Sequence, residues 1–241
     1  MRLKLAACFT LIAALLVGCA TRSISDSGYQ KESYYGAKTA TNPLYKGELS
    51  EFEVLGIDPH ARVTPEEVAK AFDQKQVLKL SKGSSIMLIQ SGALIPDEAM
   101  VKALEKYYDV SVFSGVPAQD GSTNYSMPLR LAAAKGGFEK IVVYWGLLET
   151  AQKGLGSKAV SWVPFVGGVV PDETQEMRVR LKVAVVDVRT GQWNMFSPEP
   201  FQDTATSARY GRESSDQAQV AVLKKKSYEA AAEDLVKRYS R

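Results

Sequence analysis

The chain has 241 residues, of which 45% are hydrophobic and 24% charged, and this is the composition of a globular protein. Its formal net charge of +3, from 30−27, falls to 28−27 = +1 if Arg2 and Lys4 are removed with a signal peptide. So small an excess of positive charge argues against a protein whose main role is to bind nucleic acid. Both cysteines, Cys8 and Cys19, lie near the amino terminus, and His60 is the one histidine. The body therefore has no disulfide, and a metal site with two or more histidine ligands is excluded.

An export signal is predicted at the amino terminus. A basic start precedes the uncharged run from Leu5 to Val17, whose 13 residues are too few to span a bilayer core of about 30 Å. That length is typical of the apolar part of a signal peptide. The run ends in Leu16-Val17-Gly18-Cys19, which resembles the lipobox of bacterial lipoproteins. The resemblance implies signal-peptidase recognition of Leu16 and Gly18, cleavage before Cys19, and modification of Cys19 by lipid, including palmitate.

The residue after Cys19 is Ala20 rather than Asp. In the lipoprotein family this implies the periplasmic face of the outer membrane. The alternative is an ordinary secretory signal in which Cys19 is incidental and the cut comes later. We expect residues 1–18 to be the signal peptide. Residues 19–50, rich in Ser, Thr, Gly, Tyr, Lys and Asn, are expected to be the lipidated cysteine and a flexible tether that lifts the domain off the membrane.

The first half of the predicted domain, residues 51–241, alternates helices and strands. Thr64-Pro65-Glu66-Glu67 predicts a helix start with Thr as N-cap, and the helical spacing of Val68 and Phe72 predicts that both face a core. The remaining signals are a buried strand at 86–89, a helix opening at 96–98, a strand at 110–113 and a helix at 126–135 that ends at a glycine pair.

The second half predicts a meander and a closing helix. Residues 141–145 are the most apolar strand signal, and 179–188 alternate as a half-buried antiparallel strand. A turn at 189–191 leads into a returning strand at 192–196, and 198–213 is expected to be a loop. The long helix from about residue 214 carries an apolar stripe made of Val220, Leu223, Ser227, Ala231, Leu235 and Tyr239. Together, these elements predict a single α/β domain with a mixed, partly antiparallel sheet covered by helices.

The segment from Val183 to Gly191 ends in Asp-x-x-Thr-Gly. With the element order, it is similar to a group of small periplasmic lipoprotein domains. These comprise the curli-secretion lipoprotein, the lipoprotein activators of peptidoglycan synthases and the N-terminal domain of the Tol-system propeller protein. The resemblance covers about residues 80–240 and implies a non-catalytic domain that binds envelope proteins. Asp187 and Gly191 are also explained as turn residues.

No catalytic, cofactor or metal constellation is predicted. His60 lies in a turn-like segment without a Gly-x-Ser-x-Gly elbow or a His-Glu-x-x-His motif elsewhere. Lys224-Lys225-Lys226 could attract anionic lipid, although a solvated helix face is favoured. The apolar segment 160–171 is either a connection folded back on the core or an exposed tip with Trp162, Phe165 and Val166 as contact residues for a partner, another subunit or the membrane.

The sequence therefore predicts an outer-membrane lipoprotein, held by lipid on Cys19, that acts as a binding or scaffold module for envelope proteins. No cofactor and no nucleic acid are expected, and homo-oligomerisation stays open. One alternative is an envelope hydrolase of the aminopeptidase kind. Another is a subunit of an oligomeric secretion assembly, against which no pair of long alternating hairpin strands is evident.

Overall fold

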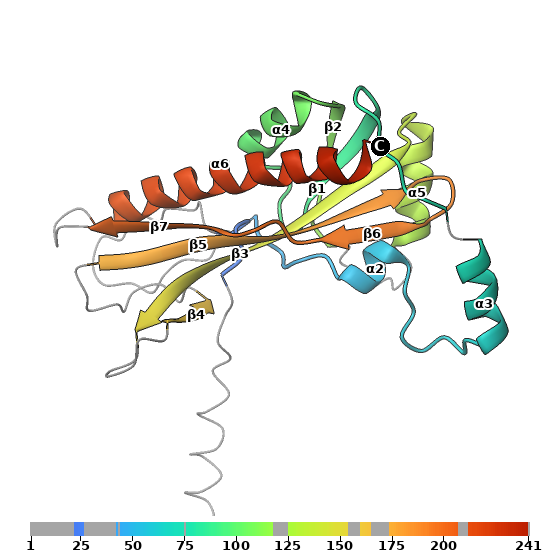
Figure 1. Ribbon diagram of the computed structural model, residues 1–241, viewed down its shortest axis with the longest axis horizontal. Coiled ribbons are helices and arrows are strands. Elements are labelled where there is room, and N and C mark those ends of the chain that lie inside the picture. The colour runs from blue at the N-terminus through green and yellow to red at the C-terminus, as the bar shows by residue number, and fades with distance from the viewer. Residues whose placement is uncertain are drawn as a thin grey trace, which may run out of the picture.

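The computed structural model describes residues 22–26, 42, 44–74, 76–117, 125–153, 160–164, 174–206 and 212–240. Within them, seven strands form one sheet in the order β2–β1–β3–β5–β6, with β4 paired to β3 and β7 to β5 (Figure 1). The strands are β1 (Ser85–Gln90), β2 (Asp109–Phe113), β3 (Lys140–Lys153), β4 (Val160–Pro164), β5 (Thr174–Asp187), β6 (Trp193–Phe196) and β7 (Phe201–Thr206). The helices are α2 (Glu51–Leu55), α3 (Pro65–Asp73), α4 (Glu98–Glu105), α5 (Ser126–Lys135) and α6 (Arg212–Tyr239).

The sheet is mixed because β3 has both parallel and antiparallel neighbours. β1 pairs in parallel with β2 on one side and with β3 on the other. β5 runs antiparallel to β3, from Lys140 opposite Asp187 to Thr150 opposite Met177. The predicted α/β class, the mixed sheet and the central place of residues 141–145 are confirmed.

Helices cover both faces of the sheet (Figure 1). Side chains alternate across a strand, so Leu88 of β1 belongs to the core under α4 and α6, and Ile89 belongs to the core with α5. The predicted half-burial of β5 holds only in part, because Val185 and Ala184 lie in these two opposite cores and both are fully buried. This explains the continuous apolar runs in both strands.

α6 confirms the predicted stripe. Its six members, Val220, Leu223, Ser227, Ala231, Leu235 and Tyr239, are each at most 9% exposed. Their spacing of three or four residues places them on one helix face, which packs against α4, β5 and β7. Burial of a large apolar side chain of this kind contributes roughly 1.5–3 kcal/mol, so this helix closes the larger of the two cores.

The turn after β5 explains the Asp-x-x-Thr-Gly sequence. The backbone N–H and the hydroxyl of Thr190 donate to Oδ1 of Asp187 at 2.7 and 2.9 Å, and Lys140 Nζ lies 2.9 Å from Oδ2. Burial alone would raise the pKa of Asp187, but these hydrogen bonds and Lys140 lower it below its ordinary value. Gly191 adopts a φ of 74°, which favours glycine. The motif therefore closes the β5–β6 hairpin.

Two segments that the sequence predicts as connections contain strands. Residues 198–213 include β7, which pairs with the first half of β5 from Thr206 opposite Thr174 to Phe201 opposite Val179, and α6 already begins at Arg212. The first residues of the 160–171 segment form β4 along the end of β3. Neither strand was predicted, because each pairs with a strand elsewhere in the chain and leaves no local pattern.

Candidate functional site

A short amino-terminal segment, residues 22–26, is built into the sheet, and we call it the strap. Ser23 forms an antiparallel bridge with Leu147 of β3. The N–H of Ile24 donates to the carbonyl of Gly146 at 3.0 Å, and the N–H of Leu148 donates to the carbonyl of Arg22 at 3.1 Å. Ordinary backbone pairing therefore holds the strap, which explains how a segment with one aliphatic side chain can be ordered.

The strap fills a gap in one edge of β3. On that edge β1 pairs as far as Tyr144, and β4 pairs from Glu149 onward. The strap lies between them, where the absence of a side chain at Gly146 makes room for Ile24. A Cβ at Gly146 would lie 2.4 Å from Cδ1 of Ile24, which is closer than packed atoms approach, so this close contact requires glycine.

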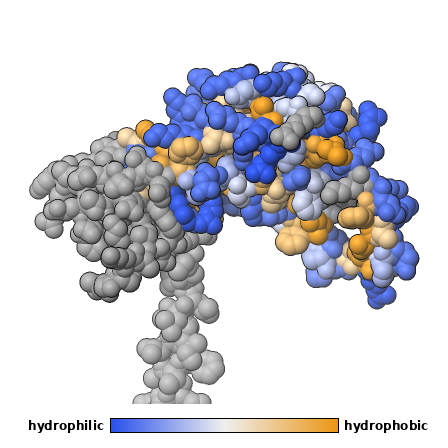
Figure 2. Space-filling model, viewed as in Figure 1, coloured by the Kyte–Doolittle hydropathy of each residue, from blue (hydrophilic) through white to orange (hydrophobic). Residues whose placement is uncertain are grey.

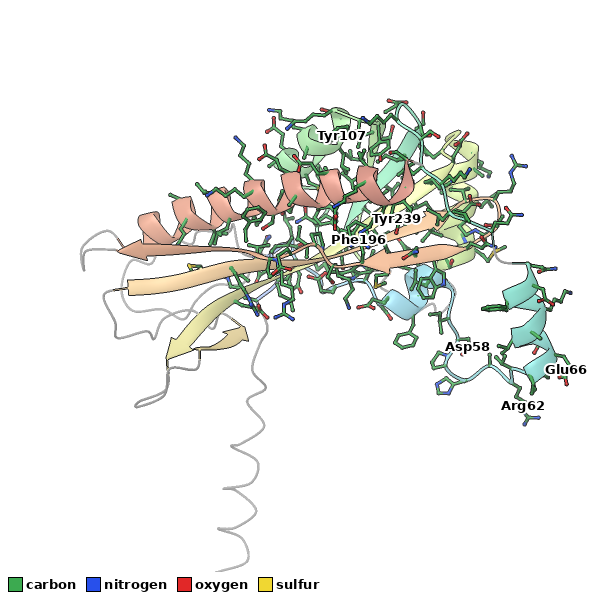
Figure 3. All side chains as sticks on the ribbon, in the orientation of Figure 1. Asp58, Arg62, Glu66, Tyr107, Phe196 and Tyr239 are labelled. Carbon is green, nitrogen blue, oxygen red and sulfur yellow. The ribbon has the colours of Figure 1, made fainter. Side chains whose placement is uncertain are left out.

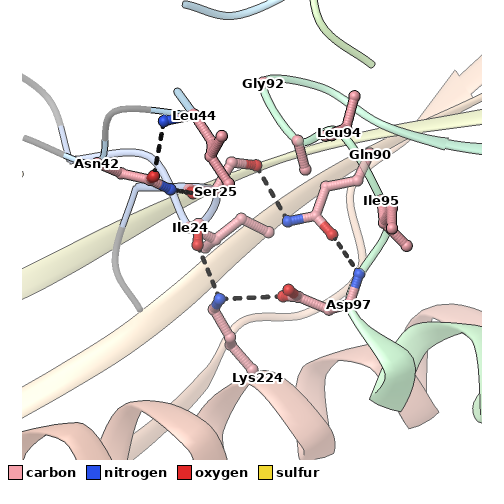
Figure 4. A pocket seen from close by; sticks show the side chains of 11 residues that line it. Ile24, Ser25, Asn42, Leu44, Gln90, Gly92, Leu94, Ile95, Asp97 and Lys224 are labelled. Carbon is pink, nitrogen blue, oxygen red and sulfur yellow. Dashed lines mark hydrogen bonds and ion pairs between the residues drawn. The ribbon is translucent and has the colours of Figure 1, made fainter. Parts of the chain in front are cut away.

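The side of the strap that faces the protein is buried. Ile24 is 1% exposed and belongs to the core under α4 and α6. Lys224 Nζ of α6 donates to the Ile24 carbonyl at 2.7 Å and pairs with Asp97 at 3.0 Å (Figure 4). With a side chain only 14% exposed, Lys224 does not match the prediction of a solvated lysine face, whereas Lys225 and Lys226 are exposed as predicted.

The predicted tether also needs correction where it is described. The chain leaves the strap at Asp26, and the N–H of Asn42 donates back to Asp26 Oδ1 at 3.0 Å. Residues 44–50 then lead into α2, and Leu49 is 2% exposed. Because Asp26 and Asn42 meet, the residues between them add no distance between Cys19 and the domain. The boundaries at residues 18 and 50 stay predictions.

A buried polar cluster holds the strap, α4 and α6 to the end of β1 (Figure 4). Gln90, the last residue of β1, donates to the Ser25 hydroxyl at 3.0 Å and accepts from the Asp97 N–H at 2.6 Å and from the Tyr144 hydroxyl. The Tyr228 hydroxyl donates to the Asp97 carboxylate. Burial raises the pKa of both tyrosines well above the ordinary value, so both stay neutral hydrogen-bond donors.

The cluster lies beside a cavity of about 310 Å³. The rim includes the exposed side chains of Leu44, Leu94 and Ile95, whereas the inner wall includes Gln90, Asp97 and Lys224. The inner polar atoms already bond to one another, to Ser25 and to the strap backbone. The geometry therefore describes a joint between four segments of the fold and not an assembled acid, base and nucleophile.

α3 is the second unusual element, because it is well formed but covers nothing. Thr64 accepts from the Glu67 N–H while the Glu67 side chain accepts from the Thr64 N–H, so the predicted helix start is confirmed as a capping box. The prediction that Val68 and Phe72 face a core is wrong. They are 59% and 73% exposed, and no residue of α3 is buried.

α3 projects from one end of the long axis of the molecule (Figure 1), and hydrophobic side chains show on the surface there (Figure 2). Gln192 ties its end to the β5–β6 turn by donating to the Gln74 carbonyl and accepting from the Gln76 N–H, at 3.0 and 3.2 Å. The charged side chains of Arg62 and Glu66 point away from the body (Figure 3). The helix is thus held in place with its apolar side open.

Most residues of the predicted sites stay untested. Cys19, Leu16 and Gly18 lie outside the described residues, as do Phe165 and Val166. Trp162 lies in β4, opposite Ala151 of β3. His60 is exposed, and among the residues described no group of three or more His, Cys, Asp or Glu is placed to hold a metal ion. In the same part of the chain, no helix has the length and apolarity to cross a bilayer.

The polar cluster was not predicted, although weak signals exist. Gln90 is the one polar residue that ends the apolar run of β1. Asp97 precedes α4 as an N-cap would, but its side chain makes no cap hydrogen bond and instead meets Lys224 and Tyr228. Those partners lie more than 120 residues away, so local sequence does not show them.

The comparisons with known proteins are consistent with the export signal. The sequence model of a family described as YafT bacterial lipoprotein matches residues 50–238. A search of curated proteins gives no match.

Solved structures that resemble the chain do so weakly. PelC from Paraburkholderia phytofirmans, solved as a dodecamer, is 14% identical over 65% of this chain and 95% of its own, with a TM-score of 0.29. The hypothetical protein CT253 from Chlamydia trachomatis is 11% identical over 65% and 97%, with a TM-score of 0.35. Lipoprotein GNA1162 from Neisseria meningitidis is 16% identical over 58% and 99%, with a TM-score of 0.26. Scores this low carry no argument about this chain.

Proposed function

Because the chain belongs to the YafT bacterial lipoprotein family, we propose that it is anchored in the outer membrane by lipid on Cys19, faces the periplasm and binds other envelope proteins. The lipobox Leu16-Val17-Gly18-Cys19 supports the anchor, and Ala20 after it supports the outer membrane. More than one acyl chain makes such anchoring stable, since each buried CH₂ contributes about 0.8 kcal/mol.

The observation that carries the binding function is the open apolar side of α3. A helix of nine residues is marginal by itself in water, and here the capping box and the Gln192 contacts support it instead of core packing. Val68 and Phe72 are four residues apart on one side. An amphipathic helix with anchors at this spacing is what proteins lay into a groove of a partner, so α3 serves as a preformed binding element.

The charges of α3 indicate the chemistry of the partner. Its polar residues include Glu66, Glu67 and Asp73 against Lys70, a net charge of −3+1 = −2. Helices that lie in a membrane interface instead carry Lys and Arg on the polar face. The partner is therefore a protein surface with an apolar groove and a basic rim, and such complementarity also speeds encounter.

Photo-crosslinking in intact cells tests this function. A benzophenone amino acid in place of Phe72 is expected to form one discrete protein adduct, and the same amino acid in place of Lys70, on the opposite side of α3, serves as the control. The substitution Asp73→Lys, combined with the probe at 72, is expected to reduce the adduct at least fivefold because it places a cation against the basic rim.

Three results would contradict the proposal. One is equal adducts from positions 70 and 72, another is capture of lipid instead of protein at position 72, and the third is an adduct that Asp73→Lys leaves unchanged. Equal protein levels and equal melting temperatures of the variants show that any loss comes from the contact and not from unfolding.

A further inference from the structure

The direction of the strap shows where the lipid-bearing end of the chain leaves the domain. Ser23 pairs antiparallel with Leu147, so lower residue numbers in the strap run toward higher numbers in β3. The strap therefore points, on its way back to Cys19, toward Glu149, where Pro164 of β4 begins to pair. The anchor leaves beside β4 and the second half of β3, which we call the β3–β4 end.

The chain that joins the strap to the lipid is short. Two residues, Ala20 and Thr21, lie between Cys19 and Arg22. An extended chain advances at most about 3.6 Å per residue, so the three steps from Cys19 to Arg22 span at most about 11 Å. A flexible spacer of the 31 residues from 20 to 50 would instead allow a root-mean-square distance of roughly 30 Å. The strap removes that freedom and keeps the domain within a few residues of the bilayer.

The strap also restricts rotation of the domain. It is tied along β3 by backbone hydrogen bonds, inside the core by Ile24, and to β1 and α6 by Ser25 and by Lys224. Detaching it would expose the Ile24 side chain and leave Lys224 and Gln90 without these partners, and buried polar groups that lose a hydrogen-bond partner destabilise the fold. The attachment is thus a rigid joint.

The sequence of the β3–β4 end suits a membrane surface. In the second half of β3 and in β4, the charged residues are Lys153 and Glu149, and Glu149 is already paired with Arg178 and Arg180. The β4 sequence contains Trp162. Tryptophan is enriched at the membrane–water interface, and a lysine near an anionic lipid surface is attracted to it. α3, with its net negative charge, lies at the opposite end of the long axis (Figure 1).

We propose that the strap fixes the orientation of the domain on the membrane, with the β3–β4 end against the lipid headgroups and α3 directed away from them. This inference rests on the proposed lipidation of Cys19. It adds that the domain is docked on the bilayer and not suspended from it, and that α3 is presented toward partners at the far end.

Energy transfer to labelled lipid tests the orientation. The lipidated full-length protein is reconstituted into vesicles of phosphatidylethanolamine and phosphatidylglycerol that contain rhodamine-labelled lipid. A donor dye is placed on Lys153→Cys at the β3–β4 end or on Glu66→Cys in α3; in the lipidated protein the sulfur of Cys19 carries the lipid and does not react with the dye. We expect the transfer efficiency at position 153 to be at least twice that at position 66, and equal efficiencies would overturn the orientation.

Two insertions of the same 20-residue Gly-Ser linker isolate the role of the strap. Inserted between Ala20 and Thr21, the linker lies between lipid and strap and is expected to bring the efficiency at 153 down to that at 66. Inserted between Gln30 and Lys31, it is expected to change nothing, because Asp26 and Asn42 still meet. Equal effects of the two insertions would overturn the inference.

Flotation of the vesicles separates this inference from the proposed function. Protein that does not float with the vesicles contradicts lipid anchoring itself. Protein that floats but shows equal transfer from both positions contradicts only the orientation.

Discussion

The burial of the strap and of α3 is the reverse of what their sequences indicate. The strap lies in a stretch rich in Ser and Thr, yet Ile24 is 1% exposed, whereas Phe72 of the amphipathic helix α3 is 73% exposed. An apolar stripe on a predicted helix indicates that the helix packs against another surface. It does not show whether that surface belongs to the same chain or to a partner protein. A polar segment can equally be ordered when a strand edge offers it backbone hydrogen bonds.

The strap should show the largest effect on stability. Ile24→Ala is expected to lower the free energy of unfolding by about 2–4 kcal/mol, because the truncation leaves a cavity in a core that relaxes only in part. Urea denaturation of the purified protein measures this. A loss below about 0.5 kcal/mol, as at an exposed site, would show that the strap is detached in solution.

The polar cluster should show the next largest effect. Tyr228→Phe removes a hydrogen bond to the Asp97 carboxylate and is expected to cost about 1–2 kcal/mol of stability. Tyr107→Phe, at a partly exposed ring that meets the Lys82 ammonium, is the control and should change stability by less than about 0.5 kcal/mol. Equal effects of the two substitutions would contradict the role of the cluster as a joint.

A smaller effect is expected at Glu48, which lies beside the strap. Burial raises its pKa above the ordinary 4.5, and the nearby hydroxyls of Ser23, Ser91 and Tyr45 offset only part of this. The folded chain therefore binds this proton more tightly than the unfolded chain does, so stability is lost as the pH rises through the raised pKa. Glu48→Gln should increase Tm at pH 7.5, on the order of 1–2 °C, and less at pH 4.5. Thermal melts at both pH values would refute this if the gain were larger at pH 4.5.

The smallest effect on stability is expected in α3. Val68→Ser and Phe72→Ser should each change the free energy of unfolding by less than about 0.5 kcal/mol, because neither side chain is buried. The same denaturation measurement, made on the purified protein, checks this. A loss of more than about 2 kcal/mol would mean that α3 packs on its own body in solution and is not open to a partner.

Elements whose signal lies within one segment were predictable. The stripe of α6, the capping box at Thr64 and the Asp187–Gly191 turn each depend on residues near one another in sequence, and all were confirmed. β7 and the strap depend on free edges of β5 and β3, and the polar cluster depends on Asp97 meeting α6. The sequence places Lys224 beside the apolar stripe, but it does not show that Lys224 binds the Ile24 carbonyl and the Asp97 carboxylate.

The contact between Lys224 and the strap joins residues 200 positions apart. In the proposed export, which starts from the amino terminus, the strap enters the periplasm before α6. Contacts of such sequence separation form late, because a long loop must close first. With Cys19 lipidated as proposed, the lipid-bearing end is therefore fixed to the body only after α6 has been translocated. On the same proposal, a truncated product that lacks α6 would carry the lipid but lack the Lys224 contact that fixes the strap.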